Sequence, residues 1–178
     1  ELFIRAIQSV QVIAGGGEYT AKADEAVKNT AADLLGSAPQ LLMYHEPEEE
    51  TSLHVVLRQE IIRYNRLISI VRESLSLLVD AIDGLVAMSD QLNEMYNAFT
   101  VGRVPEMWVS VAYPSMKPLV PWFADLIKRV DFIRAWDLKG PPTVFWFGGL
   151  FFPQSFLTGI LQSFSRKHHI SVNTLRFR

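Results

Sequence analysis

The chain has 178 residues, of which 49% are hydrophobic and 20% charged, and its formal net charge is −2. These values exclude a disordered chain and predict a globular one that is long enough to bury a core. The slight negative charge gives no overall attraction to nucleic acid or anionic lipid, and the absence of cysteine excludes disulfides, thiolate metal sites and a cysteine nucleophile.

The first 50 residues predict two short helices and a linker. Apolar residues at helical spacing predict a helix over residues 2–13, and Gly15, Gly16 and Gly17 end it. A second helix is expected over residues 20–35, with Gly36 as its C-terminal cap. Two prolines and an acidic run mark residues 37–50 as a linker.

The strongest periodic signal is an apolar stripe in alternating steps of four and three, here called the heptad stripe. Its members are Leu57, Ile61, Tyr64, Ile68, Val71, Leu75, Leu78, Ile82 and Leu85. This pattern predicts one long helix over residues 52–83, with Thr51 as its N-cap and an interruption near Gly84. A stripe this narrow predicts packing against another helix.

Two further amphipathic helices are expected in the middle of the sequence. Ser89 is the predicted cap of a helix that ends at Gly102, with Leu92, Met95, Tyr96 and Phe99 facing inward. After an irregular stretch over residues 108–114, residues 119–138 predict a helix that Gly140 ends. Its apolar face comprises Leu119, Phe123, Leu126, Ile127, Val130, Ile133 and Trp136.

The last 40 residues are the most apolar, and they predict strand, turn, helix and strand. Strands are expected over residues 143–147 and 172–177, with a helix over residues 153–167 between them. Since no strand follows to pair with the last one, and since the sequence begins at Glu1, we expect a fragment of a longer protein. We divide it into residues 1–50, 51–140 and 141–178.

Several short motifs invite a chemical interpretation, and each has a simpler one. The glycine run Gly15–Gly17 resembles a phosphate loop, but Lys22 lies at the wrong spacing and no strand precedes it, so a flexible loop is favoured. His168 and His169 are adjacent on a helix and point in different directions, which favours a solvated helix end over a metal site.

The acidic run is interpreted in the same way. Glu46, Glu48, Glu49 and Glu50, with His45 and His54 nearby, lack the spacing of a calcium loop and predict a solvated linker. No serine stands in a G-x-S-x-G elbow, and no group of residues matches a catalytic template. We therefore predict no catalytic, nucleotide-binding or metal-binding residue in this sequence.

An uncharged stretch over residues 143–165 raises the question of a membrane span, since its length is near the roughly 20 residues required. Two adjacent glycines, Pro153 and several polar residues interrupt it. A buried strand–turn–helix explains these better than one spanning helix.

Four collinear blocks resemble the C-terminal region of dynein heavy chains, and the axonemal type in particular. They read LRQEIIRYNRLISIVRESLSLLVDAIDGLVAMSDQLNEMYNAF, GRVPEMW, YPSMKPLVPWFADLIKRVDFIRAW and GPPTVFWFGGLFFPQSFLTGILQSFSRKHHISVNTLRF. The resemblance is firm from Leu57 onward, and it is closest to axonemal heavy chains in the block of residues 145–162.

The resemblance implies a helical region that lies across a ring of six AAA modules, on the face opposite the linker. It implies a fold of mainly α class, a bundle of amphipathic helices in which the strands at 143–147 and 172–177 begin an incomplete β-barrel. It also implies that the fragment does not hydrolyse ATP or touch the microtubule, but braces the ring and modulates force and processivity. ATP and Mg²⁺ would belong to the parent protein.

The expected partners are then the AAA modules of the same heavy chain, with other dynein subunits and microtubules reached through the parent protein, and neither nucleic acid nor membrane. The expected location is the cytoplasm and cytoskeleton, in the axoneme of a cilium or flagellum. An alternative is an independent helical scaffold or adaptor that binds a partner helix through the heptad stripe.

Overall fold

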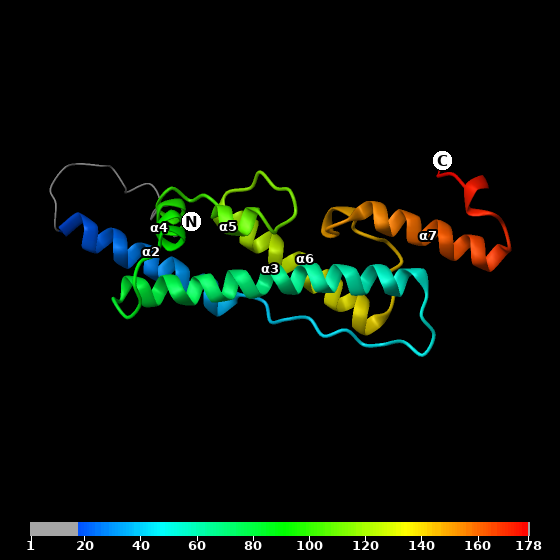
Figure 1. The fold of residues 1–178 in the computed structure, drawn as a ribbon, viewed down its shortest axis with the longest axis horizontal. Coiled ribbons are helices and arrows are strands. Elements are labelled where there is room, and N and C mark those ends of the chain that lie inside the picture. The colour runs from blue at the N-terminus through cyan, green and yellow to red at the C-terminus, as the bar shows by residue number, and fades with distance from the viewer. Residues whose placement is uncertain (1–17, 178) are drawn as a thin grey trace. The chain divides into compact units, whose positions relative to one another are not determined.

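A computed structural model describes residues 18–177, and every regular element in that range is helical (Figure 1). In sequence order these are α2 (Glu18–Ser37), α3 (Ser52–Ile82), α4 (Asp90–Thr100), α5 (Glu106–Val109), α6 (Leu119–Lys139), the 3₁₀ turn η1 (Phe147–Gly149), α7 (Pro153–His168) and the 3₁₀ turn η2 (Val172–Thr174). The predicted helix over residues 2–13 and the glycine run after it lie outside the described residues.

The described residues form two compact units. The first unit combines the residues up to Pro39 with Leu67–Asp125, and the second combines Gln40–Arg66 with the residues from Leu126 onward. Helices α3 and α6 therefore contribute one part of their length to each unit. The division at residues 50 and 140 that the sequence suggests remains a prediction.

The ends of α3 follow from local hydrogen bonds. The Thr51 hydroxyl accepts from the His54 amide at 3.4 Å, and the His54 ring accepts from the Thr51 amide at 3.1 Å, so the two residues form a reciprocal N-terminal cap. At the other end, Gly84 takes φ of +74°, and the Leu85 amide donates to the Asp80 carbonyl at 2.9 Å. These contacts confirm the predicted start of α3 and its interruption near Gly84.

The heptad stripe is the buried face of α3. All of its members up to Leu78 are buried, whereas Ile82 is half-buried and Leu85 is exposed. Burial of large apolar side chains stabilises each by roughly 1.5–3 kcal/mol relative to exposure, so this face dominates the stability of the helix.

An aromatic cluster fills the core of the first unit. Trp108 on α5 is fully buried, stacks on Trp122 with ring centroids 5.6 Å apart, and meets Phe99 edge-on at 6.0 Å. Trp122 in turn stacks on Tyr113 at 5.9 Å. The indole of Trp108 donates a 2.8 Å hydrogen bond to Ser74, which satisfies its one polar group.

The second unit has its own aromatic cluster, which packs α6 against the segment that leads into α7. Phe156 on α7 is buried and lies 4.3 Å from Phe145, 5.4 Å from Phe147 and 6.1 Å from Trp136, centroid to centroid. Trp146 meets Phe132 edge-on at 6.0 Å. The apolar residues before α7 therefore do anchor the helix, as aromatic contacts of an irregular segment.

The strands predicted at residues 143–147 and 172–177 are wrong, and with them the start of a β-barrel. The described residues contain no strand: residues 143–146 are irregular, η1 follows, and η2 occupies part of the second segment. Aromatic and β-branched residues fit any half-buried surface, and here Phe145 and Phe147 satisfy that preference against Phe156 without a ladder partner.

Other sequence predictions meet mixed outcomes. Gly36 does not end α2, because the helix continues to Ser37. Ser89 does cap α4, since its hydroxyl accepts from the Leu92 amide at 3.3 Å, and Gly102 and Gly140 take φ of +67° and +81° after the helices they follow. Within residues 18–177, no helix combines the length and apolarity that crossing a membrane requires.

Candidate functional site

The most distinctive group in the second unit is a buried carboxylate on α3. Glu60 is fully buried, and its two oxygens accept backbone hydrogen bonds from Phe151 at 2.6 Å and Phe152 at 3.0 Å. Phe152 is the N-cap residue of α7, so the negative charge lies where the helix dipole favours it. Glu60 thus joins α3 to the first turn of α7.

Burial dominates the electrostatics of this carboxyl group. Desolvation raises the pKa of Glu60 above its ordinary value, against the opposing effects of the two backbone amides and of the Arg63 and Arg129 guanidinium groups. Arg63 lies 3.7 Å from the carboxylate and also stacks over the Phe152 ring at 5.3 Å. The carboxylate therefore has partners, but they do not fully replace the water it has lost.

The segment before α7 is held by α3 at a second point. The Tyr64 hydroxyl donates to the Gly149 carbonyl at 2.7 Å, and the Tyr64 ring meets Phe151 edge-on at 4.7 Å. A Cβ on Gly149 would lie 2.6 Å from Trp146 Cε3, so this position requires glycine. Two successive turns of α3 thus fix residues 149–152.

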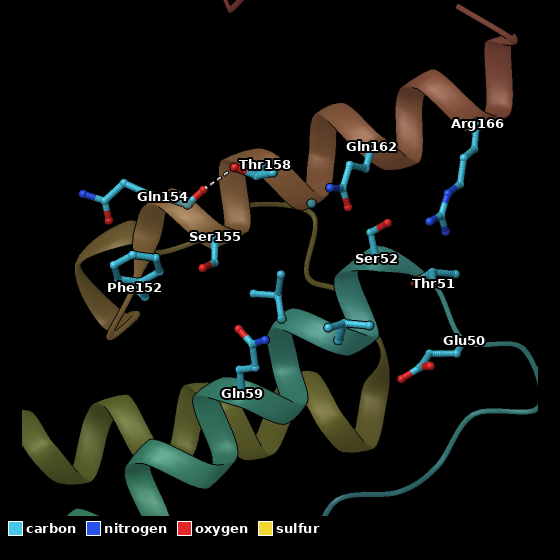
Figure 2. Close-up of a pocket in the computed structure, with 13 residues that line it drawn as sticks. Glu50, Thr51, Ser52, Gln59, Phe152, Gln154, Ser155, Thr158, Gln162 and Arg166 are labelled. Carbon is cyan, nitrogen blue, oxygen red and sulfur yellow. Dashed lines mark hydrogen bonds between the residues drawn. The ribbon is translucent and has the colours of Figure 1, made fainter. Parts of the chain in front are cut away.

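A pocket of about 400 Å³ lies beside this clamp, between the first turns of α3 and one side of α7 (Figure 2). Its lining is largely polar: Glu50, Thr51, Ser52, Gln59, Gln154, Ser155, Thr158, Gln162 and Arg166, with Val55, Val56, Phe152 and Gly159. A volume of this size is in the range of small-ligand sites, but the lining lacks the usual apolar majority.

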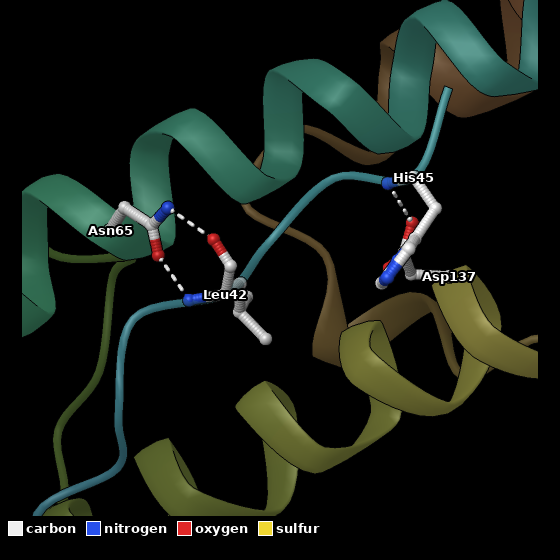
Figure 3. A network of polar contacts seen from close by, with 4 residues as sticks. All are labelled: Leu42, His45, Asn65 and Asp137. Atoms are coloured by element: carbon white, nitrogen blue, oxygen red, sulfur yellow. Dashed lines mark hydrogen bonds and ion pairs between the residues drawn. The ribbon is translucent and has the colours of Figure 1, made fainter.

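Side chains pin the segment that leads into α3 (Figure 3). The Asn65 amide accepts from the Leu42 N–H at 2.7 Å and donates to the Leu42 carbonyl at 2.8 Å. The Asp137 carboxylate accepts from the His45 amide at 3.1 Å and contacts the His45 ring at 2.5 Å. One residue from α3 and one from α6 therefore fix the backbone of residues 42–45.

The first unit has its own polar links. The Tyr96 hydroxyl donates to Asp24 at 2.7 Å, and burial together with this bond raises the pKa of Tyr96 to about 12. Lys28 pairs with Asp83 at 2.5 Å. These contacts join α2 to the elements around it, and we find no catalytic geometry in them.

The candidate histidines lie apart from one another. His168 stacks on Phe164 at 4.2 Å, and His169 takes the left-handed C-cap conformation that ends α7. His45 belongs to the pinned segment and His54 to the α3 cap. Among residues 18–177, no three histidine, aspartate or glutamate side chains come together as a possible metal site.

The remaining candidates are at the surface or outside the described range. Lys22 is exposed or nearly so on α2, while the glycine run Gly15–Gly17 precedes the described residues. The acidic run is largely exposed, and Glu50 pairs with Arg58 at 3.4 Å. The structure does not assemble these residues into one site.

Sequence reasoning missed Glu60, Asn65 and Asp137. Glu60 lies three residues after Leu57 and four before Tyr64, so it flanks the heptad stripe, and that spacing was the available signal for its burial. Asn65 and Asp137 act on backbone groups far away in the sequence, for which no local pattern exists.

Comparison with known proteins identifies similar sequences over all 178 residues. A family model described as the C-terminal domain of the dynein heavy chain matches residues 1–178. Human dynein axonemal heavy chain 3 is 44% identical over 159 residues, which cover 86% of this sequence and 4% of that protein. Human dynein axonemal heavy chain 1 is 51% identical over 128 residues, which cover 72% of this sequence and 3% of that protein.

A more distant relative extends the match further along the sequence. Human dynein axonemal heavy chain 6 is 37% identical over 185 aligned residues, which cover 98% of this sequence and 4% of that protein. The 178 residues therefore span only a few per cent of the length of these relatives.

Proposed function

Because this protein belongs to the family of dynein heavy-chain domains at the C-terminal end, we propose that it packs on the AAA ring of its own axonemal heavy chain and modulates the mechanics of the motor. The observation that carries the proposal is the family match over residues 1–178, together with axonemal relatives that are 44% and 51% identical over most of the sequence. On this proposal the domain works in the axoneme of a cilium or flagellum.

The proposed role is structural and regulatory rather than catalytic. Its supporting features are clamps between elements: Glu60 on the entry to α7, Asn65 on Leu42, and Asp137 on His45. Such contacts hold helices in fixed relation, which is what transmission of strain through a domain requires. On this proposal ATP, Mg²⁺ and microtubule binding belong to the parent protein.

A surface for packing is also present in the second unit. Val144 is 82% exposed, and Trp146, Phe147 and Phe152 are between 39% and 46% exposed, all within residues 144–152. Concentrated exposed apolar side chains are typical of surfaces that another protein segment covers. On this proposal the surface contacts the AAA ring.

The alternative function, a scaffold that binds a partner helix through the heptad stripe, conflicts with burial. The stripe up to Leu78 is already inside the protein's own core, and Leu85 at its end is its one exposed member. A partner helix could reach the stripe only if the core opened.

Deletion of this domain from the full heavy chain tests the proposal. We expect altered ATPase coupling, stall force or run length, with nucleotide binding by the AAA modules retained. Single-molecule motility and steady-state ATPase assays on the same preparations measure these quantities. If all three remained at wild-type values, the proposed mechanical role would be wrong.

A further inference from the structure

The face of α7 that lines the pocket has an unusual composition. Ser155, Gly159, Gln162 and Arg166 follow each other at steps of four, three and four, so they form one side of the helix. Figure 2 shows Ser155, Gln162 and Arg166 directed toward the first turns of α3. A helix face that packs for stability alone is normally apolar, and this one is polar.

A buried hydroxyl faces this polar side. Ser52, the first residue of α3, is 7% exposed, and its Oγ has no hydrogen-bond partner among the described residues. Figure 2 shows the side chain pointing into the pocket, toward Gln162 and Arg166. Because an unpaired buried polar group is costly, this hydroxyl indicates a partner that binds in the pocket.

The backbone adds two further donors at the same point. The amides of His54 and Val55 donate to the Thr51 carbonyl, whereas those of Ser52 and Leu53 make no such bond within residues 18–177. They are the free N–H groups at the positive end of a long helix, where anions are bound most readily.

The charges around the pocket favour an anion as well. Arg166 lines the pocket and makes no ion pair within the described part of the sequence. The one acidic residue of the lining, Glu50, is paired with Arg58 at 3.4 Å. Positive charge from Arg166 and from the α3 dipole therefore acts on the same space.

We propose that this pocket binds a phosphate-type oxyanion. The Ser52 and Leu53 amides, the Ser52 hydroxyl and the Gln162 amide supply hydrogen bonds, and Arg166 supplies the charge-assisted pair. The volume of about 400 Å³ exceeds what one phosphate fills, so the group that bears the phosphate has room beside Gln59, Gln154 and Phe152.

Titration of the 178-residue protein with inorganic phosphate at constant ionic strength tests the site. Isothermal calorimetry should show saturable binding, and the amide signals of Ser52 and Leu53 should shift in NMR spectra. Arg166→Gln should weaken binding about tenfold or more, because a charge-assisted bond is lost. Lys167→Gln removes the neighbouring charge, which does not line the pocket, and should leave affinity within about twofold.

Ser52→Ala separates binding from folding. Since the hydroxyl has no partner among the described residues, its removal should leave thermal stability unchanged or raised, while phosphate affinity falls about threefold to tenfold. Acetate, run in parallel, should bind more weakly than phosphate.

Three results would overturn the proposal. The first is an absence of saturable phosphate binding by the wild-type protein. The second is an equal loss of affinity in the Arg166 and Lys167 variants, which would indicate diffuse electrostatic attraction. The third is acetate binding as tight as that of phosphate.

Discussion

At the scale of single residues, the second unit depends on one glutamate that its charge alone would place in solvent. Glu60 accepts two backbone hydrogen bonds just before α7, at 2.6 and 3.0 Å, while it is removed from water. These bonds recover part of the desolvation cost of the charge, and the raised pKa shows that part of the cost remains.

This residual cost predicts a pH dependence. The folded protein retains the Glu60 proton at pH values just above 4.5, where the unfolded protein has released it, so the stabilisation is present below pH 4.5 and is lost as pH rises through the folded pKa. The free energy of unfolding of wild type minus that of Glu60→Gln should therefore fall from pH 4.5 toward neutrality. Urea denaturation across this range measures it.

A matched control lies on the same helix. Glu73 is exposed on α3, and Glu73→Gln should show no comparable trend in its difference from wild type. A flat difference for Glu60→Gln as well would show that the carboxyl group is not desolvated as described.

At the scale of elements, α5 shows why a four-residue helix exists at all. Helices this short are unstable alone, and α5 is held by the buried Trp108, whose N–H reaches Ser74 on α3 at 2.8 Å. The sequence allowed a short turn of helix here, but nothing local identified Trp108 as the centre of the core or Ser74 as its partner.

Ser74→Ala tests this link. It leaves a buried indole N–H without an acceptor, and should lower the free energy of unfolding by about 1–3 kcal/mol. Ser76→Ala, at an exposed position two residues on, should change it by less than about 0.5 kcal/mol. Equal effects in chemical denaturation of the two variants would contradict a specific role for Ser74.

The same scale explains which elements the sequence could predict. Helices α3, α4 and α6 have long periodic faces and sharp ends, so their existence and approximate limits followed from local pattern. The segments at 143–147 and 172–177 contain strand-forming residues, but a strand requires a partner, and that information is not local. Here aromatic contacts with Phe156 and the 3₁₀ turns took its place.

At the scale of the whole molecule, resemblance and structure contribute different parts. The collinear blocks indicated the family from Leu57 onward, and the comparisons extend the match to all 178 residues. The helical class was predictable, whereas the clamps by Glu60, Asn65 and Asp137 were not, because each joins segments that lie far apart in the sequence.

The exposed apolar residues between 144 and 152 predict self-association of the domain when it is separated from its parent protein. Val144→Asp should reduce this association, as measured by light scattering against concentration, and should leave the free energy of unfolding within about 0.5 kcal/mol. Met116→Asp is the control, because Met116 is a fully exposed residue of the first unit outside this surface. An equal reduction in both variants would mean that added charge alone suppresses association.

The pinned segment before α3 has a practical consequence. His45 is fixed by Asp137 and Thr51 by His54, so both ends of the acidic stretch between them are anchored independently of its own residues. Lengthening a loop whose ends are already held costs little, roughly 0.6 kcal/mol for each doubling. Residues 46–50 therefore form a natural insertion point, where a fluorophore-binding tag could be added to follow this domain in a working motor without disturbing either core.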